Sequence, residues 1–223
     1  PMMGARNRSA RNMPESDKLL RRAKRKSLKK DTYHHGNLRR ALLDSALAMV
    51  EKEGPHGVSL RAVARLAGVS PAAPYRHFAG KEGLLAALAE EGFCALEQQM
   101  QSASQATRGL ALAEFRAIGF AYVRFAARNP SHFCVMFGPE VSDKSEHPSL
   151  KEAADRASQI FADAIANFQR PELEGGDTDP QRLFISAWST FHGLALCLST
   201  GSQKPLQHTS KLLVELEDEE ADW

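Results

Sequence analysis

The stretch from Val58 to Lys81, VSLRAVARLAGVSPAAPYRHFAGK, constrains the fold most, because it holds two short helical patterns around a tight turn. Ser59 is placed to cap the first pattern, since its hydroxyl can accept an early backbone N–H. Apolar residues then recur at spacings of three and four as far as Ala67. Gly68 stands where a residue in the left-handed conformation ends a helix. The pattern predicts a short helix that stops at Gly68.

The second pattern begins at Ser70, a further capping candidate, with Pro71 at the first helical position, where a missing N–H costs nothing. It predicts a helix from Pro71 to about Phe78 that is short and rigid at its start, because Pro74 removes one intrahelical hydrogen bond. Two short helices around a glycine turn form a helix-turn-helix, whose second helix lies in the DNA major groove.

The second helix also carries groups suited to DNA contact. Ala72 and Ala73 are small, so the backbone can approach base edges, while Tyr75, Arg76 and His77 carry hydrogen-bonding groups that reach phosphates or bases. This composition favours a nucleic-acid contact surface over an ordinary core helix.

A longer run of residues resembles the DNA-binding domain of the TetR/AcrR family of bacterial transcriptional regulators. The run is SPAAPYRHF at 70–78, followed by KEGLL at 81–85. In that family Tyr-x-His-Phe ends the recognition helix and Lys-Glu opens the next helix. The family usually has leucine where this chain has Pro74, a departure that concerns base readout and not the fold.

The C-terminal half resembles a module found in many TetR/AcrR regulators. The similar residues are YVRF at 122–125, NPSHFCVMFG at 129–138 and WSTFHG at 188–193. In the family, the body forms a homodimer through its last two long helices and holds a small ligand inside. The resemblance, which covers roughly 33–200, implies three partners: double-stranded operator DNA, a second copy of the chain, and an apolar or amphipathic small-molecule effector. It implies a repressor that the effector releases.

These two lines of argument together predict the site residues. Base contacts are expected from Ala72, Ala73 and Arg76. Phosphate or sugar contacts are expected from residues around them, with Pro71 on the same surface: Ser59, Arg61, Ser70, Tyr75, His77 and Lys81. Candidates for the ligand pocket are Phe133, Met136, Phe137, Trp188 and His192. Candidates for the dimer interface are Phe161, Phe184, Ala187, Phe191 and Gly193.

The pocket candidates have a second interpretation. Trp188 and His192 lie one helical turn apart, and a packed tryptophan beside a hydrogen-bonded core histidine is the interpretation we favour for His192. Phe133, Met136 and Phe137 fit a pocket wall and a simple core equally, because both use aromatic and methionine side chains.

The rest of the chain predicts an all-α fold. An amphipathic helix at 37–53, stopped by Gly54, would cover the helix-turn-helix, and Arg39 and Arg40 near its start could face phosphate. Phe78 would close the core of this three-helix head. Further apolar patterns predict helices at 81–103, 110–129, 131–137, 149–169 and 181–200. The expected domains are a disordered basic arm at 1–32, the DNA-binding head at 33–80, a ligand-binding and dimerisation body at 81–205, and an acidic tail at 206–223.

Charge is distributed unevenly along the chain. Residues 1–40 hold 13 Lys or Arg and 3 acidic residues, whereas the remainder holds 16 Lys or Arg and 24 acidic residues. A basic segment on an acidic body predicts a polyanionic partner that meets one end of the molecule. The alternative is a solvated tail without a role.

Other classes of protein find little support. Cys94, Cys134 and Cys197 fit no metal-ligand spacing and suggest reduced thiols, and His34 and His35 are adjacent without further ligands, so no metal is expected. No P-loop or nucleophile elbow occurs, so neither an enzyme nor a cofactor is expected. Without a membrane-spanning run or a secretion signal, the sequence favours the bacterial cytoplasm. A ligand-independent architectural DNA-binding protein and a helical enzyme stay open as alternatives.

Overall fold

The computed structural model describes residues 38–107, 109–141, 143–168 and 179–199, and within these ranges the chain is helical without a strand. The all-α prediction is therefore confirmed. The basic arm, the segment 33–37 with its two histidines, and the acidic tail lie outside the described residues. None of the described helices is long and apolar enough to cross a membrane.

The head begins with a helix at 38–53, which ends at Gly54 with a φ of 72° before the 3₁₀ helix η1, Pro55–Gly57. Helix α2, Leu60–Leu66, follows. The backbone N–H of Ala62 donates to Oγ of Ser59 over 3.3 Å, so the predicted cap is confirmed. Gly68 has a φ of 68°, which confirms the predicted left-handed stop after the first helix.

The second helix of the motif differs from the prediction. Residues 71–78 form turns and the 3₁₀ helix η2, Pro74–Arg76, instead of an α-helix. The reason is local, because Pro74 lacks the N–H that would donate to the carbonyl oxygen of Ser70 in an α-helix. The remaining bonds are mostly between residues three apart, such as Ala73 N–H to Ser70 O at 2.9 Å and Arg76 N–H to Ala73 O at 3.2 Å.

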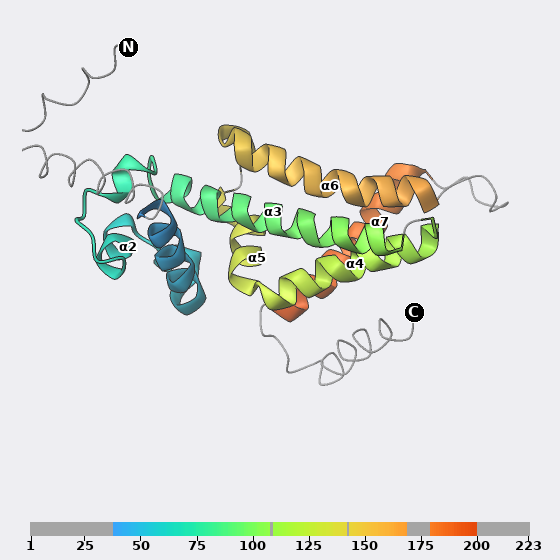
Figure 1. Cartoon of the computed structure of the whole chain (residues 1–223), viewed down its shortest axis with the longest axis horizontal. Helices are drawn as coiled ribbons and strands as arrows, with labels where there is room; N and C mark the ends of the chain where they lie inside the picture. The colour runs from blue at the N-terminus through green and yellow to red at the C-terminus, as the bar shows by residue number, and fades with distance from the viewer. Residues whose placement is uncertain (1–37, 108, 142, 169–178, 200–223) are drawn as a thin grey trace, which may run out of the picture.

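Helix α3, Lys81–Ala106, joins the head to the body (Figure 1). Its 26 residues make it longer than predicted, about 39 Å at 1.5 Å per residue. Its first half contributes buried leucines beside the head, and its second half contributes buried residues to the body. The buried side chains of both parts form one continuous cluster, in which Phe78 is 4% exposed, as predicted for a core residue.

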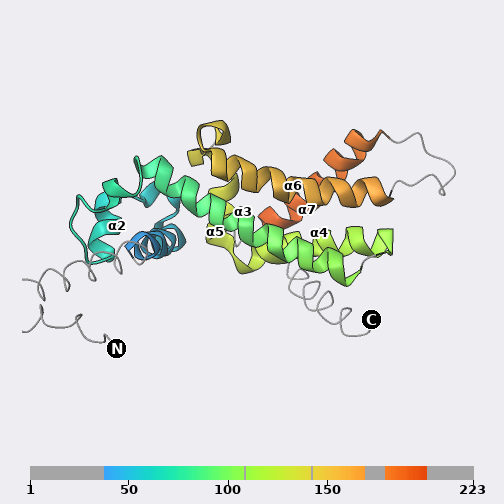
Figure 2. The ribbon, with the colours of Figure 1, turned by 45° about the horizontal axis from the view of Figure 1, so that its top comes forward.

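The body consists of α3 and four further helices: α4 Ala111–Arg128, α5 Pro130–Phe137, α6 Pro148–Phe168 and α7 Pro180–Ser199. Their bounds agree with the predicted helices to within a few residues. Two 3₁₀ helices, η3 Pro139–Val141 and η4 Lys144–Glu146, replace the loop expected between α5 and α6. Helix α3 packs against α4, α5 and α6, and α7 packs on α4 (Figures 1 and 2).

Two glycines allow close packing in the body. A Cβ atom on Gly92 of α3 would lie 2.5 Å from Sδ of Met136, so α5 approaches α3 at this point. A Cβ atom on Gly119 of α4 would lie 2.1 Å from Cζ of Phe191, because that ring rests directly on the glycine. These contacts fix the positions of α5 and α7, whose side chains border the cavity described below.

Candidate nucleic-acid interface and effector cavity

The predicted DNA-contacting residues gather on one exposed side of the head. Ser59 and Arg61 at the start of α2 are exposed. So are Ser70, Pro71, Ala72, Tyr75 and Arg76 in the segment around η2, where Tyr75 is 57% exposed. Ala73 and His77 are half-buried. The two prolines of this segment differ in burial: Pro74 is buried under the segment and Pro71 is exposed.

Lys81 lies at the start of α3, where its Nζ donates to the carbonyl oxygen of His56 over 2.9 Å. This bond ties α3 to η1 and fixes the ammonium group at the edge of the exposed surface. An ammonium group has three N–H donors, so this contact leaves donors for a phosphate. Arg39 lies with its guanidinium carbon 5.6 Å from the centre of the Phe78 ring, a cation–π contact on the head core.

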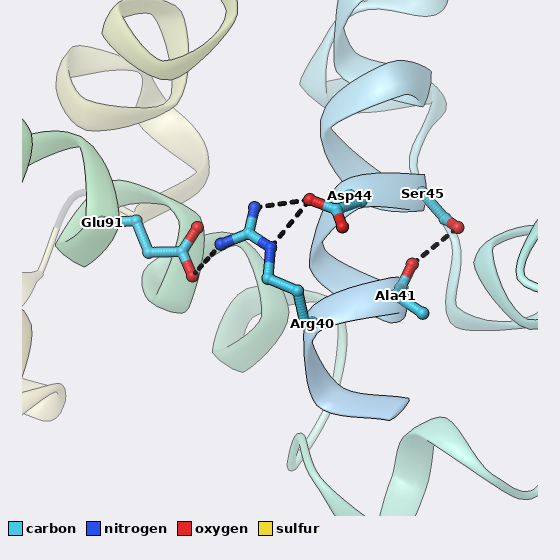
Figure 3. A network of polar contacts seen from close by, with 5 residues as sticks. All are labelled: Arg40, Ala41, Asp44, Ser45 and Glu91. Atoms are coloured by element: carbon cyan, nitrogen blue, oxygen red, sulfur yellow. Dashed lines mark hydrogen bonds and ion pairs between the residues drawn. The ribbon is translucent and has the colours of Figure 1, made fainter. Parts of the chain in front are cut away.

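Arg40 makes its contacts inside the chain. Its Nε donates to Oδ1 of Asp44 over 2.8 Å, and its Nη1 donates to Oε1 of Glu91 on α3 over 3.0 Å (Figure 3). The hydrogen bond to Asp44 raises the pKa of Arg40. The sequence suggested a phosphate contact for Arg40, but the structure gives it a different task, which is to join the first helix to α3.

A second polar contact joins the head to the body. Nδ1 of His56, next to the backbone carbonyl held by Lys81, lies 3.0 Å from Oε1 of Glu140 in η3. Glu140 follows α5 by three residues, and its side chain is only 9% exposed. The end of α5 is thus connected to η1 through one carboxylate–imidazole pair.

An aromatic cavity lies in the body between α3, α4, α5, α6 and α7. The space open to the centre of a water molecule is about 40 Å³, so a larger ligand requires the lining side chains to move. Most of the residues that line the cavity are apolar. The lining consists of Phe93, Leu96, Met100, Tyr122, Phe137, Ala157, Ser158, Phe161, Phe184, Trp188 and Phe191. Of the five predicted pocket residues, the structure brings Phe137 and Trp188 to this lining.

The other three pocket candidates have different surroundings. Phe133 and Met136 are 1% and 0% exposed and belong to the core of α5, which is the simple-core interpretation. His192 lies beside the lining, with its ring stacked on Trp188 at 4.6 Å between centres and 12° between planes. Its edge contact with Phe137 is 4.7 Å. His192 therefore positions two lining rings.

The buried side chain of Tyr122 forms a hydrogen bond with His192. The hydroxyl of Tyr122 lies 2.7 Å from Nδ1 of His192. Burial raises the pKa of Tyr122 and lowers the pKa of His192, so both groups are neutral near pH 7. A neutral imidazole with its proton on Nε2 accepts from the phenol at Nδ1, and one with its proton on Nδ1 donates to the phenol oxygen, so either tautomer forms this bond. This bond supports the favoured interpretation of a hydrogen-bonded core histidine.

This pair predicts acid sensitivity. Because the folded pKa of His192 lies below its usual value of 6.5, the unfolded chain takes up the proton first as the pH falls. The stability from the neutral imidazole is present above pH 6.5 and is lost below it. Urea unfolding at pH 7.5 and 5.5 should show a smaller pH dependence for His192→Asn than for the unchanged chain. Burial also lowers the pKa of His132, so His132→Asn is the control that measures the contribution of this second histidine to the pH dependence. An unchanged pH dependence in His192→Asn would contradict the prediction.

The residues predicted for the dimer interface lie mostly inside the body. Phe161 is 4% exposed, and its ring centre lies 5.9 Å from that of Phe184 and 5.8 Å from that of Phe191. Ala187 is half-buried against the same core, and Gly193 is exposed. The structure corrects the prediction for these phenylalanines, because the rings of Phe161 on α6 and of Phe184 and Phe191 on α7 fill the space between α4, α6 and α7.

The outer face of α7 carries other apolar residues, which the sequence analysis did not select. Ile185 is 56% exposed, Trp188 38% and Leu196 41%. No atom lies within 4 Å of a Cβ built on Gly193, so this face is open at its middle. Spacing alone did not distinguish the two sides of α7, because apolar residues occur on both.

The chain is similar to known regulators in both halves. Residues 42–88 match the family described as bacterial regulatory proteins, tetR family, and residues 115–216 match the tetracyclin repressor-like C-terminal domain. The HTH-type transcriptional regulator YobS of Bacillus subtilis is 32% identical over 130 residues, which are 58% of this chain and 60% of YobS. The chain thus matches somewhat less than two thirds of the length of this relative.

Solved structures share the fold of this chain. A protein of unknown function from Rhodococcus sp. RHA1 is 33% identical, with a TM-score of 0.65 over 83% of this chain and 94% of the other. FadR of Bacillus subtilis, solved with stearoyl-CoA, has a TM-score of 0.62 over 79% of this chain and 96% of the other at 16% identity, which shows a shared fold.

Proposed function

Because this chain belongs to the TetR family of bacterial regulatory proteins, we propose that it is a DNA-binding transcriptional regulator, a homodimeric repressor released by a small apolar or amphipathic effector. One observation carries the proposal. The segment around η2 exposes Ser70, Ala72, Tyr75 and Arg76 together on the head, while Pro74 anchors the segment to the core from below. Exposed polar and small residues on a rigid support suit contact with a DNA groove.

The outer face of α7 supports the homodimer. Ile185, Trp188 and Leu196 expose apolar surface along one side of a helix, and Gly193 between them permits close approach of a second helix. A two-fold axis at this face buries the same residues of both copies. Two heads on one body can then meet two half-sites of an operator.

The aromatic cavity supports an apolar effector. Its lining is mainly aromatic, and the polar groups in or beside it include the hydroxyl of Ser158 and the phenol and imidazole of the Tyr122–His192 pair. A shared fold with FadR, whose solved structure holds stearoyl-CoA, agrees with an effector that has a long apolar part. Growth of the cavity beyond about 40 Å³ requires rings such as Phe137 to move.

Movement of Phe137 has a route to the DNA-binding surface. Phe137 ends α5, Met136 beside it packs on Gly92 of α3, and Glu140 just after it pairs with His56 of the head. A displaced α5 would therefore push on α3 and pull on η1. The contact with His56 ends beside Lys81, whose Nζ holds the carbonyl oxygen of His56 at the edge of the exposed surface, and the contact with Gly92 is made on the helix that Lys81 begins.

Operator readout tests the DNA-binding proposal. Arg76→Ala should reduce discrimination at one base position by about 1–3 kcal/mol, because a bidentate base contact is lost. Tyr75→Phe should weaken binding to all sequences alike, because phosphate contacts carry no sequence information. Binding selection on randomised duplexes measures both effects. Full discrimination by Arg76→Ala would remove Arg76 from the base-contacting set.

Linkage tests effector control. If an effector lowers operator affinity, the operator must lower effector affinity by the same factor, for a coupling of about 1–3 kcal/mol. Calorimetry with and without operator measures that factor. Glu140→Ala should reduce it while leaving each separate affinity nearly unchanged, because the contact between this side chain and His56 is lost. Equal effector affinities with and without operator would favour the ligand-independent architectural alternative.

A further inference from the structure

A second concave surface lies outside the aromatic cavity. The C-terminal half of α3 and almost the whole of α4 border an open groove of about 1500 Å³. Small residues form much of its wall, among them Ala103, Ala106 and Ala117. At one end, Leu110 and Leu112 are 65% and 55% exposed. An exposed apolar groove of this size is typical of a binding site.

A row of arginines gives the groove its charge. Arg116, Arg124 and Arg128 line it together with Phe120, all from α4. These four positions are spaced by four residues, so they follow one face of the helix. The guanidinium carbon of Arg116 lies 5.8 Å from the centre of the Phe120 ring. The lining of the groove therefore combines apolar side chains with three cationic ones.

We propose that this groove is the docking site of the chain's own acidic segment, residues 206–223, which lies outside the described residues. The segment holds six acidic residues and one lysine, with Leu212, Leu213 and Leu216 among them. Its leucines match the alanine wall, and its carboxylates match the arginine row. Residues 1–30 hold 11 Lys or Arg, and the same row repels them.

The end of α7 brings the acidic segment within reach of this groove. Helix α7 contacts both α4 and α5, and it ends at Ser199 beside the junction of those two helices (Figures 1 and 2). An extended chain spans up to about 3.3–3.6 Å per residue, whereas α4 is only about 27 Å long. The segment can therefore run back along α4 from its C-terminal end. The family match also continues to residue 216, past the end of α7, so the domain includes residues of this segment.

Zero-length crosslinking of the full chain tests the proposal. Arg124→Lys places a primary amine in the groove, and a water-soluble carbodiimide joins an amine only to a carboxylate in direct contact. Mass spectrometry should find position 124 linked to a carboxylate within 215–222. Arg182→Lys on α7, whose side chain is 85% exposed and lies outside the groove, is the matched control and should give no such link. At about 1 M salt, where the Debye length is roughly 3 Å, the link at position 124 should fall strongly.

Three results would overturn the proposal. Absence of any link at position 124, with the helical content of Arg124→Lys unchanged, would leave the groove without this occupant. Links from 215–222 only to lysines of residues 1–30 would place the acidic segment on the basic arm instead. In a mixture of ¹⁴N- and ¹⁵N-labelled chains, links of mixed mass would assign the groove to the segment of a second copy. Links of uniform mass at position 124 support docking within one chain.

Discussion

Replacing Phe161 with alanine should lower the free energy of unfolding by about 3–5 kcal/mol, the usual cost of removing a buried aromatic ring. Phe161 is 4% exposed, and its ring contacts those of Phe115, Phe184 and Phe191 from two other helices. Removing this ring leaves an empty space between α4, α6 and α7, beside the aromatic cavity. These three helices can close that space only in part. Urea unfolding at matched chain concentration measures the effect, since association alters apparent stability.

The matched control for this prediction is Leu66→Ala. Leu66 is 58% exposed, so its truncation should change stability by no more than about 0.5 kcal/mol. Phe161→Leu keeps part of the packed volume and should lose less than Phe161→Ala. A loss below about 1 kcal/mol in Phe161→Ala would contradict the placement of this ring between α4, α6 and α7.

Deleting residues 1–30 should strongly weaken DNA binding at low salt. The segment holds 11 Lys or Arg, and each phosphate that it neutralises adds about 0.9 to the slope of log affinity against log salt. With roughly half of these side chains on phosphates, the slope should fall by about 3–5. Binding isotherms at several salt concentrations measure the slope.

The same deletion should leave operator preference nearly unchanged, because the exposed residues of the head remain. Substituting only the cluster Arg21, Arg22, Lys24, Arg25 and Lys26 with glutamine keeps the chain length and should reproduce much of the change. An unchanged slope would place the basic segment away from the DNA and support the alternative of a solvated tail without a role.

Local signals in the sequence predicted local structure well. The hydroxyl of Ser59 caps the start of its helix, Gly68 follows the end of that helix in the left-handed conformation, and Phe78 lies in the core. The helix expected at 71–78 was wrong, although its cause was visible in the sequence. Pro74 removes the donor that would bond to the carbonyl oxygen of Ser70 in an α-helix, and this loss outweighs the helical pattern.

Contacts between distant residues could not be predicted in the same way. Tyr122 and His192 are 70 residues apart, and neither sequence neighbourhood indicates the other. The face of α7 was also ambiguous, because Phe184 and Ile185 are adjacent and both apolar, yet one is inside and the other exposed. Which face a helix buries depends on its neighbours, here on the space that Gly119 leaves for Phe191.

Helix α3 has a consequence for the way in which the molecule melts. Leu84, Leu85 and Leu88 in its first half belong to the same buried cluster as Leu96 and Met100 in its second half. Neither the head nor the body has a closed core without this helix, so loss of one removes a wall from the other. The two parts should therefore unfold as one cooperative unit. A compound that binds and stabilises the body would then raise the melting temperature of the distant head as well. This holds even where the compound lowers the affinity of the head for DNA.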